Sequence, residues 1–147
     1  NYLNNKIIVM TVKGTEIKTK EEIANIKVGI QAKSAALEAV TADPSYGTIK
    51  PSITEYNTYD EVIMDMQAGR LQAMIVDEVF GSYKNAKLGN IFTVSTVDFG
   101  DDFYAIGFRK ADLSLTQAVN KAIADLVAEG KAGEISTAWF GADIMIK

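Results

Sequence analysis

The stretch from Ile26 to Val40 places a hydroxyl side chain where a strand gives way to a helix. Its first half, to Ile30, alternates apolar and other residues with the period of a strand, and its second half spaces apolar residues as a helix does. Such a junction leaves the first N–H groups of the helix at the end of the strand, where the helix dipole favours negative charge. The pattern predicts an anion site at Ser34, although a serine that only caps the helix fits the same pattern.

A pair of carboxylates follows a second predicted strand. Residues 73–76, AMIV, are continuously apolar, as in a strand buried on both faces of a parallel sheet, and Asp77 and Glu78 come directly after it. Ligands of such sheets bind beyond the carboxyl ends of the strands, so Asp77 is a second candidate, with an ordinary helix cap as its alternative. A metal or glycosidase site is disfavoured, because adjacent carboxylates seldom face each other and no third ligand is evident.

The composition excludes several classes of protein. The chain has 147 residues, of which 48% are hydrophobic and 23% charged, as in ordinary globular proteins. Its net charge of -4 and its lack of Lys and Arg clusters argue against nucleic-acid binding. With no cysteine and no histidine, it has no disulfide, no Cys/His zinc site and no His-based triad, and nothing indicates a cofactor.

The predicted elements alternate as β-α-β-α-β-α-β over residues 26–97. This order predicts an α/β fold in which a mostly parallel, mixed sheet is flanked by helices on both faces. Two further strands are expected, at Lys6–Val12 and Phe103–Arg109, the second separate from a strand at Ile91–Val97. Three capping boxes are predicted, at Thr19–Glu22, Thr58–Glu61 and Ser114–Gln117.

The C-terminal part of the chain is predicted to form two amphipathic helices. An apolar stripe runs from Leu115 to Val127 up to Gly130, and a shorter helix carries Ile135 and Trp139. These faces need a cover, and we expect them to belong to a second lobe. The spacing of most aromatic residues predicts that they pack in a core; they are Tyr59, Phe80, Tyr83, Phe103, Tyr104 and Trp139.

Four segments together resemble one family, the substrate-binding proteins of ABC transporters for polar amino acids such as glutamine, histidine, arginine or cystine. Each is weak alone, but they occur in the family's order and spacing over nearly the whole chain. They are Ile26–Gln31 (IKVGIQ), Gly69–Asp77 (GRLQAMIVD), Phe103–Lys110 (FYAIGFRK) and Trp139–Gly141 (WFG).

The resemblance implies a periplasmic-binding-protein-like clamp of two lobes joined by two hinge strands. Residues 1–12 would be the end of the first lobe and a hinge strand, and residues 13–102 the second lobe. Residues 103–109 would be the return hinge strand, and residues 110–147 C-terminal helices of the first lobe. The chain opens without an initiator Met or a signal-like segment, so we expect it to be part of a larger protein, with half of the clamp.

The resemblance also implies a ligand site for an amino-acid zwitterion. Ser34 and the backbone N–H of Ala35 match positions that bind the carboxylate, and Asp77 matches an aspartate that binds the ammonium group. Gln31 matches a position near the ligand side chain or the hinge. Lys33 stands where relatives usually have glycine, so it either reaches an acidic or polar ligand or points into water. Ala35 replaces a common Thr or Ser and removes one hydroxyl donor.

The resulting prediction is a non-enzymatic, extracytoplasmic fragment of a solute-binding protein that captures a polar amino acid for the permease of an ABC importer. One alternative is a small-molecule lyase or dehydratase on the same fold, which would have to use Asp77, Glu78 or Lys33. Another is a fragment that forms a homodimer, through lobe exchange or an exposed apolar face.

Overall fold

The computed structural model describes residues 1–147, which divide into two compact units. Unit 1 comprises residues 1–5 and 102–147, and unit 2 comprises residues 6–101. In chain order the elements are β1 (Leu3–Val12), η1 (Glu21–Asn25), β2 (Val28–Gln31), α1 (Ala35–Ala42), α2 (Tyr46–Ile49), η2 (Lys50–Ser52), β3 (Ile53–Tyr56), α3 (Tyr59–Gln67), β4 (Ala73–Asp77), α4 (Glu78–Lys87), β5 (Phe92–Tyr104), α5 (Leu113–Ala128) and α6 (Lys131–Phe140). None of the helices is both long and apolar enough to cross a bilayer.

Unit 2 is built on a mixed sheet with the strand order β3-β2-β4-β1-β5. Strand β2 pairs in parallel with both β3 and β4, whereas β1 pairs with β4 in antiparallel fashion. The order of elements between residues 26 and 97 follows the predicted alternation, so the predicted α/β fold is confirmed.

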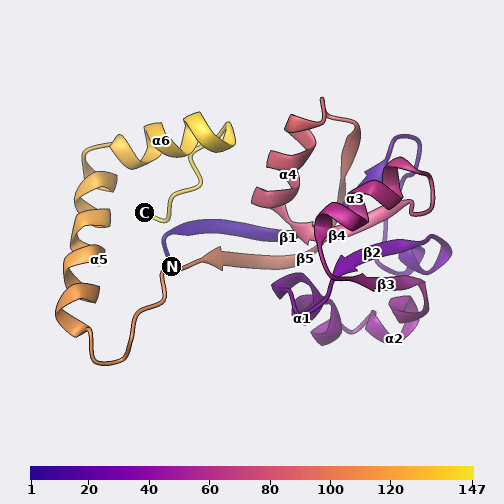
Figure 1. Ribbon diagram of the computed structural model, residues 1–147, viewed down its shortest axis with the longest axis horizontal. Coiled ribbons are helices and arrows are strands. Elements are labelled where there is room, and N and C mark those ends of the chain that lie inside the picture. The colour runs from indigo at the N-terminus through magenta and orange to yellow at the C-terminus, as the bar shows by residue number, and fades with distance from the viewer. The chain divides into compact units, whose positions relative to one another are not determined.

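Helices cover both faces of this sheet (Figure 1). On β4, Ile75 faces the core formed with α1 and α2, while Met74 and Val76 face the core formed with α3. Strand β1 divides in the same way, since Val9 joins the first core and Met10 the second. The apolar runs in the sequence are therefore strands that bury side chains on both faces.

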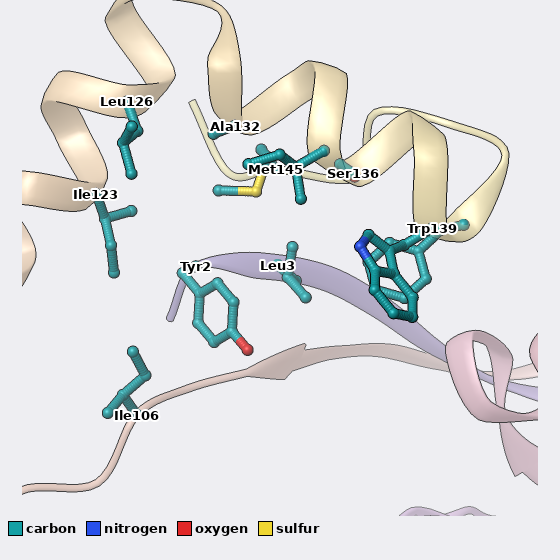
Figure 2. Close-up of a pocket in the computed structure, with 11 residues that line it drawn as sticks. Tyr2, Leu3, Ile106, Ile123, Leu126, Ala132, Ser136, Trp139 and Met145 are labelled. Carbon is teal, nitrogen blue, oxygen red and sulfur yellow. The ribbon is translucent and has the colours of Figure 1, made fainter.

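Unit 1 packs two helices beside the first residues of the chain. Helix α5 buries none of its residues, and α6 buries only Ala132 and Ser136. This unit contains an open groove of about 530 Å3. Figure 2 shows the apolar side chains around it. Its lining includes Leu3, Ile106, Ile123, Leu126, Ile135 and Trp139. The predicted amphipathic helices are confirmed, and much of their apolar face is exposed.

The structure corrects the prediction of a separate strand over residues 103–109. Strand β5 runs without a break from Phe92 to Tyr104, and residues 105–109 are not in a strand. Within β5, Gly100 adopts a positive φ of 99°, and its N–H donates to the Asp98 carboxylate at 3.0 Å. These two features give the strand a turn-like kink at this point. The strand continues through this local kink.

Two of the three capping boxes are wrong. Thr58 and Glu61 form the predicted reciprocal bonds at the start of α3. At Thr19–Glu22, however, the Glu22 carboxylate accepts the Lys18 N–H instead, and the helix is a short 3-10 turn. Helix α5 begins before Ser114, with no side-chain cap. The core prediction also fails for three aromatic residues that are largely exposed: Tyr83, Phe103 and Trp139.

Candidate functional site

Ser34 and Asp77 lie at the same edge of the sheet in unit 2. Strands β2 and β4 run parallel, with Val28 beside Ala73 and Gly29 beside Met74. Both strands therefore end at one edge, and α1 and α4 begin there. We call Gln31, Lys33, Ser34, Ala35 and Asp77 the sheet-edge site. All five residues predicted from the sequence lie at this edge, just after or at the ends of two neighbouring strands.

Ser34 fixes the start of α1 by two hydrogen bonds. Its hydroxyl donates to the Gln31 carbonyl at 2.7 Å and accepts the Leu37 N–H at 3.2 Å. Its backbone is extended, with φ −93° and ψ 160°, as an N-cap requires. The capping alternative is thus confirmed. It is compatible with anion binding, because helix geometry leaves the N–H groups of the first turn, beginning with Ala35, without partners inside the helix.

Lys33 and Gln31 lie at the loop between β2 and α1. Lys33 is exposed and adopts a left-handed backbone with φ 58°, a conformation that glycine adopts most easily. This explains why the family resemblance leads one to expect glycine there. The Gln31 amide donates to the Asn57 carbonyl at 3.0 Å, so this side chain ties the loop to the start of α3.

Asp77 both ends β4 and caps α4. Its Oδ1 accepts the Phe80 N–H at 2.9 Å, and the residue is half-buried. Its backbone pairs with Ile7 of β1. The carboxylate is therefore fixed in orientation, which suits it to bind a cation at the sheet edge. Glu78, the next residue, is exposed.

Tyr59 adds a buried hydroxyl to this edge that the sequence did not reveal as part of the site. The residue is only 7% exposed, and its hydroxyl donates to the Ile75 carbonyl at 2.9 Å. Burial and the nearby Asp77 charge raise the pKa of Tyr59 to about 12, although hydrogen bonding with Ser34 and the Gln31 backbone opposes the shift. The position of Tyr59 in the chain could have revealed its role, because Tyr59 begins the helix that follows β3, and β3 ends at the same edge of the sheet.

The arrangement suits a molecule with separate negative and positive ends. A helix N-terminus at Ala35 favours an anion, and the fixed Asp77 carboxylate favours a cation. No three acidic, histidine or cysteine side chains gather where they could hold a metal ion.

Comparison with known proteins gives relatives along nearly the whole chain. No protein-family model matches it. The chain is 27% identical over 148 residues to the L-cystine-binding protein of Escherichia coli, a match covering 97% of this chain and 53% of the relative. It is 31% identical over 100 residues to the histidine-binding periplasmic protein of Salmonella typhimurium, covering 63% of this chain and 38% of the relative.

Solved structures agree. An ABC transporter substrate-binding protein of Streptococcus pneumoniae with bound histidine is 28% identical, with a TM-score of 0.78 over 99% of this chain and 61% of that one. The chain is similar over nearly its whole length to polar amino-acid substrate-binding proteins of ABC transporters. A second structure, described as Tv2483 bound to L-arginine, matches the fold with a TM-score of 0.78 at 23% identity. The chain spans about half the length of the curated relatives it matches, 53% for the cystine-binding relative.

Proposed function

We propose that the sheet-edge site binds the zwitterion of a polar amino acid, in an extracytoplasmic binding protein that serves the permease of an ABC importer. The observation that carries the proposal is the parallel register of β2 and β4, which brings Ser34 and Asp77 to one edge. The relatives are named for binding cystine, histidine, arginine or lysine, and several are named as periplasmic.

In this proposal each end of the ligand has its own partner. The carboxylate binds at the N-terminus of α1, to the Ser34 hydroxyl and the Ala35 N–H. The ammonium group binds the Asp77 carboxylate, and a charge-assisted bond of that kind contributes about 1.5–3 kcal/mol. Gln31 and Lys33 flank the ligand side chain. The Asp77 cap persists because a carboxylate accepts more than one hydrogen bond. The Ser34 oxygen still accepts the Leu37 N–H while its proton turns from the Gln31 carbonyl to the ligand carboxylate.

Unit 2 would be the second lobe of the family's clamp and unit 1 part of the first, with β1 and β5 as the connecting strands. The two units found in the structure support this division. Ligand binding would favour the closed clamp because the closed state offers more contacts. The contacts of unit 2 alone predict weak, millimolar binding by this chain, about −4 kcal/mol.

The test is an NMR titration of the 147-residue chain with L-arginine, L-histidine, L-glutamine and L-cystine. We expect amide shifts at residues 34–37 and 77–80, with millimolar affinity for at least one amino acid. The decisive variant is Asp77→Asn, since asparagine still caps α4 but carries no charge. It should weaken binding at least tenfold, as loss of a charge-assisted bond requires.

Two controls isolate the charge of Asp77. Asp98→Asn removes another carboxylate of unit 2, one that pairs with Lys6 at 3.4 Å, and should leave affinity unchanged. The N-acetyl derivative of the same amino acid lacks the ammonium group, so wild type and Asp77→Asn should bind it equally. Absence of shifts at both segments, or equal affinity of wild type and Asp77→Asn for the free amino acid, would refute the proposal.

A second candidate function, self-association, rests on the apolar groove of unit 1. Trp139 is 69% exposed and Ile135 57%, and exposed apolar patches of this kind promote association. Sedimentation equilibrium of the chain would show a dimer whose dissociation constant rises in Trp139→Ser. A monomer at every concentration would exclude it.

A further inference from the structure

Tyr59 lies where α3 connects the two halves of the sheet-edge site. It is the first residue of α3, held there by the Thr58–Glu61 capping box. Its hydroxyl donates to the carbonyl of Ile75, two residues before Asp77. Since Ile75 and Asp77 belong to the same strand, this bond anchors the end of β4 to α3.

The ring of Tyr59 reaches the helix that Asp77 caps. Its centroid lies 5.4 Å from that of Phe80, in a tilted arrangement. Phe80 is also the residue whose N–H binds the Asp77 carboxylate at 2.9 Å. Tyr59 therefore contacts the strand before Asp77 and the residue that orients its carboxylate.

The start of α3 is also tied to the other half of the site. The Gln31 amide donates to the carbonyl of Asn57 at 3.0 Å, two residues before Tyr59. Ser34 in turn holds the Gln31 carbonyl and the first turn of α1. The start of α3, which the Tyr59 hydroxyl anchors to β4, thus links the proposed carboxylate site to the proposed ammonium site.

We propose that Tyr59 is a positioning residue that sets the spacing between Ser34 and Asp77, so that both ends of one amino-acid zwitterion bind together; this rests on the function proposed above. A zwitterion has a fixed distance between its charges, so the two partners must be held at a matching distance. Without the hydroxyl, the end of β4 and the start of α4 lose their bond to α3 and can move independently of α1.

The test compares Tyr59→Phe with Tyr56→Phe in the 147-residue chain, by the NMR titration described above. Both variants lose one tyrosine hydroxyl bond in unit 2, but the Tyr56 hydroxyl binds the Asp65 carboxylate at 2.7 Å instead of the site. We expect Tyr59→Phe to weaken binding of the free amino acid about tenfold and Tyr56→Phe to leave it unchanged. Circular dichroism checks that both are folded at the temperature used.

A second readout separates positioning from loss of stability. The N-acetyl amino acid binds through its carboxylate alone, so Tyr59→Phe should bind it as the wild type does. The preference for the free amino acid over its N-acetyl form therefore falls in Tyr59→Phe only. A variant that was merely less well folded would bind both ligands more weakly by the same factor, and that result would overturn the proposal.

The two proposals fail in different ways. If the wild type binds the free amino acid at residues 34–37 and 77–80 but Tyr59→Phe keeps full affinity and preference, the role of Tyr59 is refuted and the function stands. If the wild type shows no shifts at either segment, the function is refuted and the positioning role falls with it. Equal weakening in Tyr59→Phe and Tyr56→Phe would also refute the positioning role.

Discussion

Unit 2 and unit 1 use the same kinds of apolar residue with different outcomes. In unit 2, strands and helices bury their apolar side chains on both faces of a sheet, and Ile75, Val9 and Met10 are fully buried. In unit 1, the only buried apolar residues are Leu3 and Ala132. An amphipathic pattern thus predicts a helix and its apolar face, but not whether the chain supplies a surface to cover that face.

The two units also differ in the polar side chains that they hold in fixed positions. The sheet-edge site lies in unit 2, where Ser34, Asp77 and Tyr59 are all held by hydrogen bonds. Unit 1 offers an apolar groove without fixed charges among its lining residues. Under the proposed function, the rigid support of unit 2 would hold two oppositely charged partners of the ligand at a set distance.

The largest contrast is expected from one substitution made in each unit. Ile75→Ala should destabilise the chain by about 3 kcal/mol, because it removes a fully buried side chain from the middle of the sheet. Ile135→Ala should change stability by no more than about 0.5 kcal/mol, since Ile135 is 57% exposed. Urea denaturation followed by circular dichroism measures both. A large loss for Ile135→Ala would show that the groove of unit 1 is covered in solution, by a second copy.

A glycine in each unit gives the next contrast. A Cβ on Gly29 of β2 would lie 2.6 Å from Val62 Cγ1 and 2.8 Å from Leu71 Cδ1, both on buried residues. Gly29→Ala should therefore cost about 1–3 kcal/mol, as α3 is forced away from β2. On Gly133 the nearest atom is the Asp143 carboxylate at 3.0 Å, which can swing aside. Gly133→Ala should be neutral or stabilise by up to about 1 kcal/mol, because alanine favours the helix. Equal destabilisation by both variants in urea would contradict this contrast.

The sequence predicted the parts of the site that depend on local pattern. The alternation of strands and helices and the continuous apolar run before Asp77 were enough to place Ser34 and Asp77 at one sheet edge. The Thr58–Glu61 capping box was predicted correctly because Thr58 is extended and α3 begins at the next residue. The same spacing failed at Thr19–Glu22, where the helix is a five-residue 3-10 helix and Glu22 accepts a different N–H.

What the sequence missed depends on contacts between distant segments. Tyr59 looked like a core aromatic residue, and it is buried, but its hydroxyl binds a carbonyl 16 residues further along the chain. Strand β5 looked like two strands because Asp98 and Gly100 favour a turn locally. Pairing with a neighbouring strand overrides that preference.

Acid should affect the two units differently. Burial raises the pKa of Asp43 in unit 2, but hydrogen bonds from Lys20, at 2.5 Å, and Ser45 outweigh burial and lower it to about 2. A pKa below the ordinary value of 3.8 means that the stabilisation is fully present above about pH 4 and is lost as pH falls through about 2. We expect a loss of about 1–2 kcal/mol over that range, measured by urea denaturation at each pH.

The variants Asp43→Asn and Asp125→Asn check this origin of the acid sensitivity. Asp43→Asn should flatten the dependence between pH 4 and pH 2. Asp125 of unit 1 forms an exposed pair with Lys121, so Asp125→Asn should leave the dependence unchanged. A wild-type slope retained in Asp43→Asn would assign the acid sensitivity to other carboxylates.

The smallest expected effect concerns positions with a positive φ. Unit 1 has glycine at each such position, Gly130 and Gly141, whereas unit 2 holds Lys33 at φ 58°. Lys33→Gly should raise the free energy of unfolding by a few tenths of a kcal/mol, because relief of the left-handed strain slightly exceeds the entropy lost by glycine. Gly130→Lys in unit 1 should lower the free energy of unfolding by about 1 kcal/mol. If Lys33 is kept for a ligand, Lys33→Gly should also weaken glutamate more than glutamine in the NMR titration. Equal affinities of Lys33→Gly and wild type for both amino acids would instead make Lys33 an exposed side chain with no role in binding.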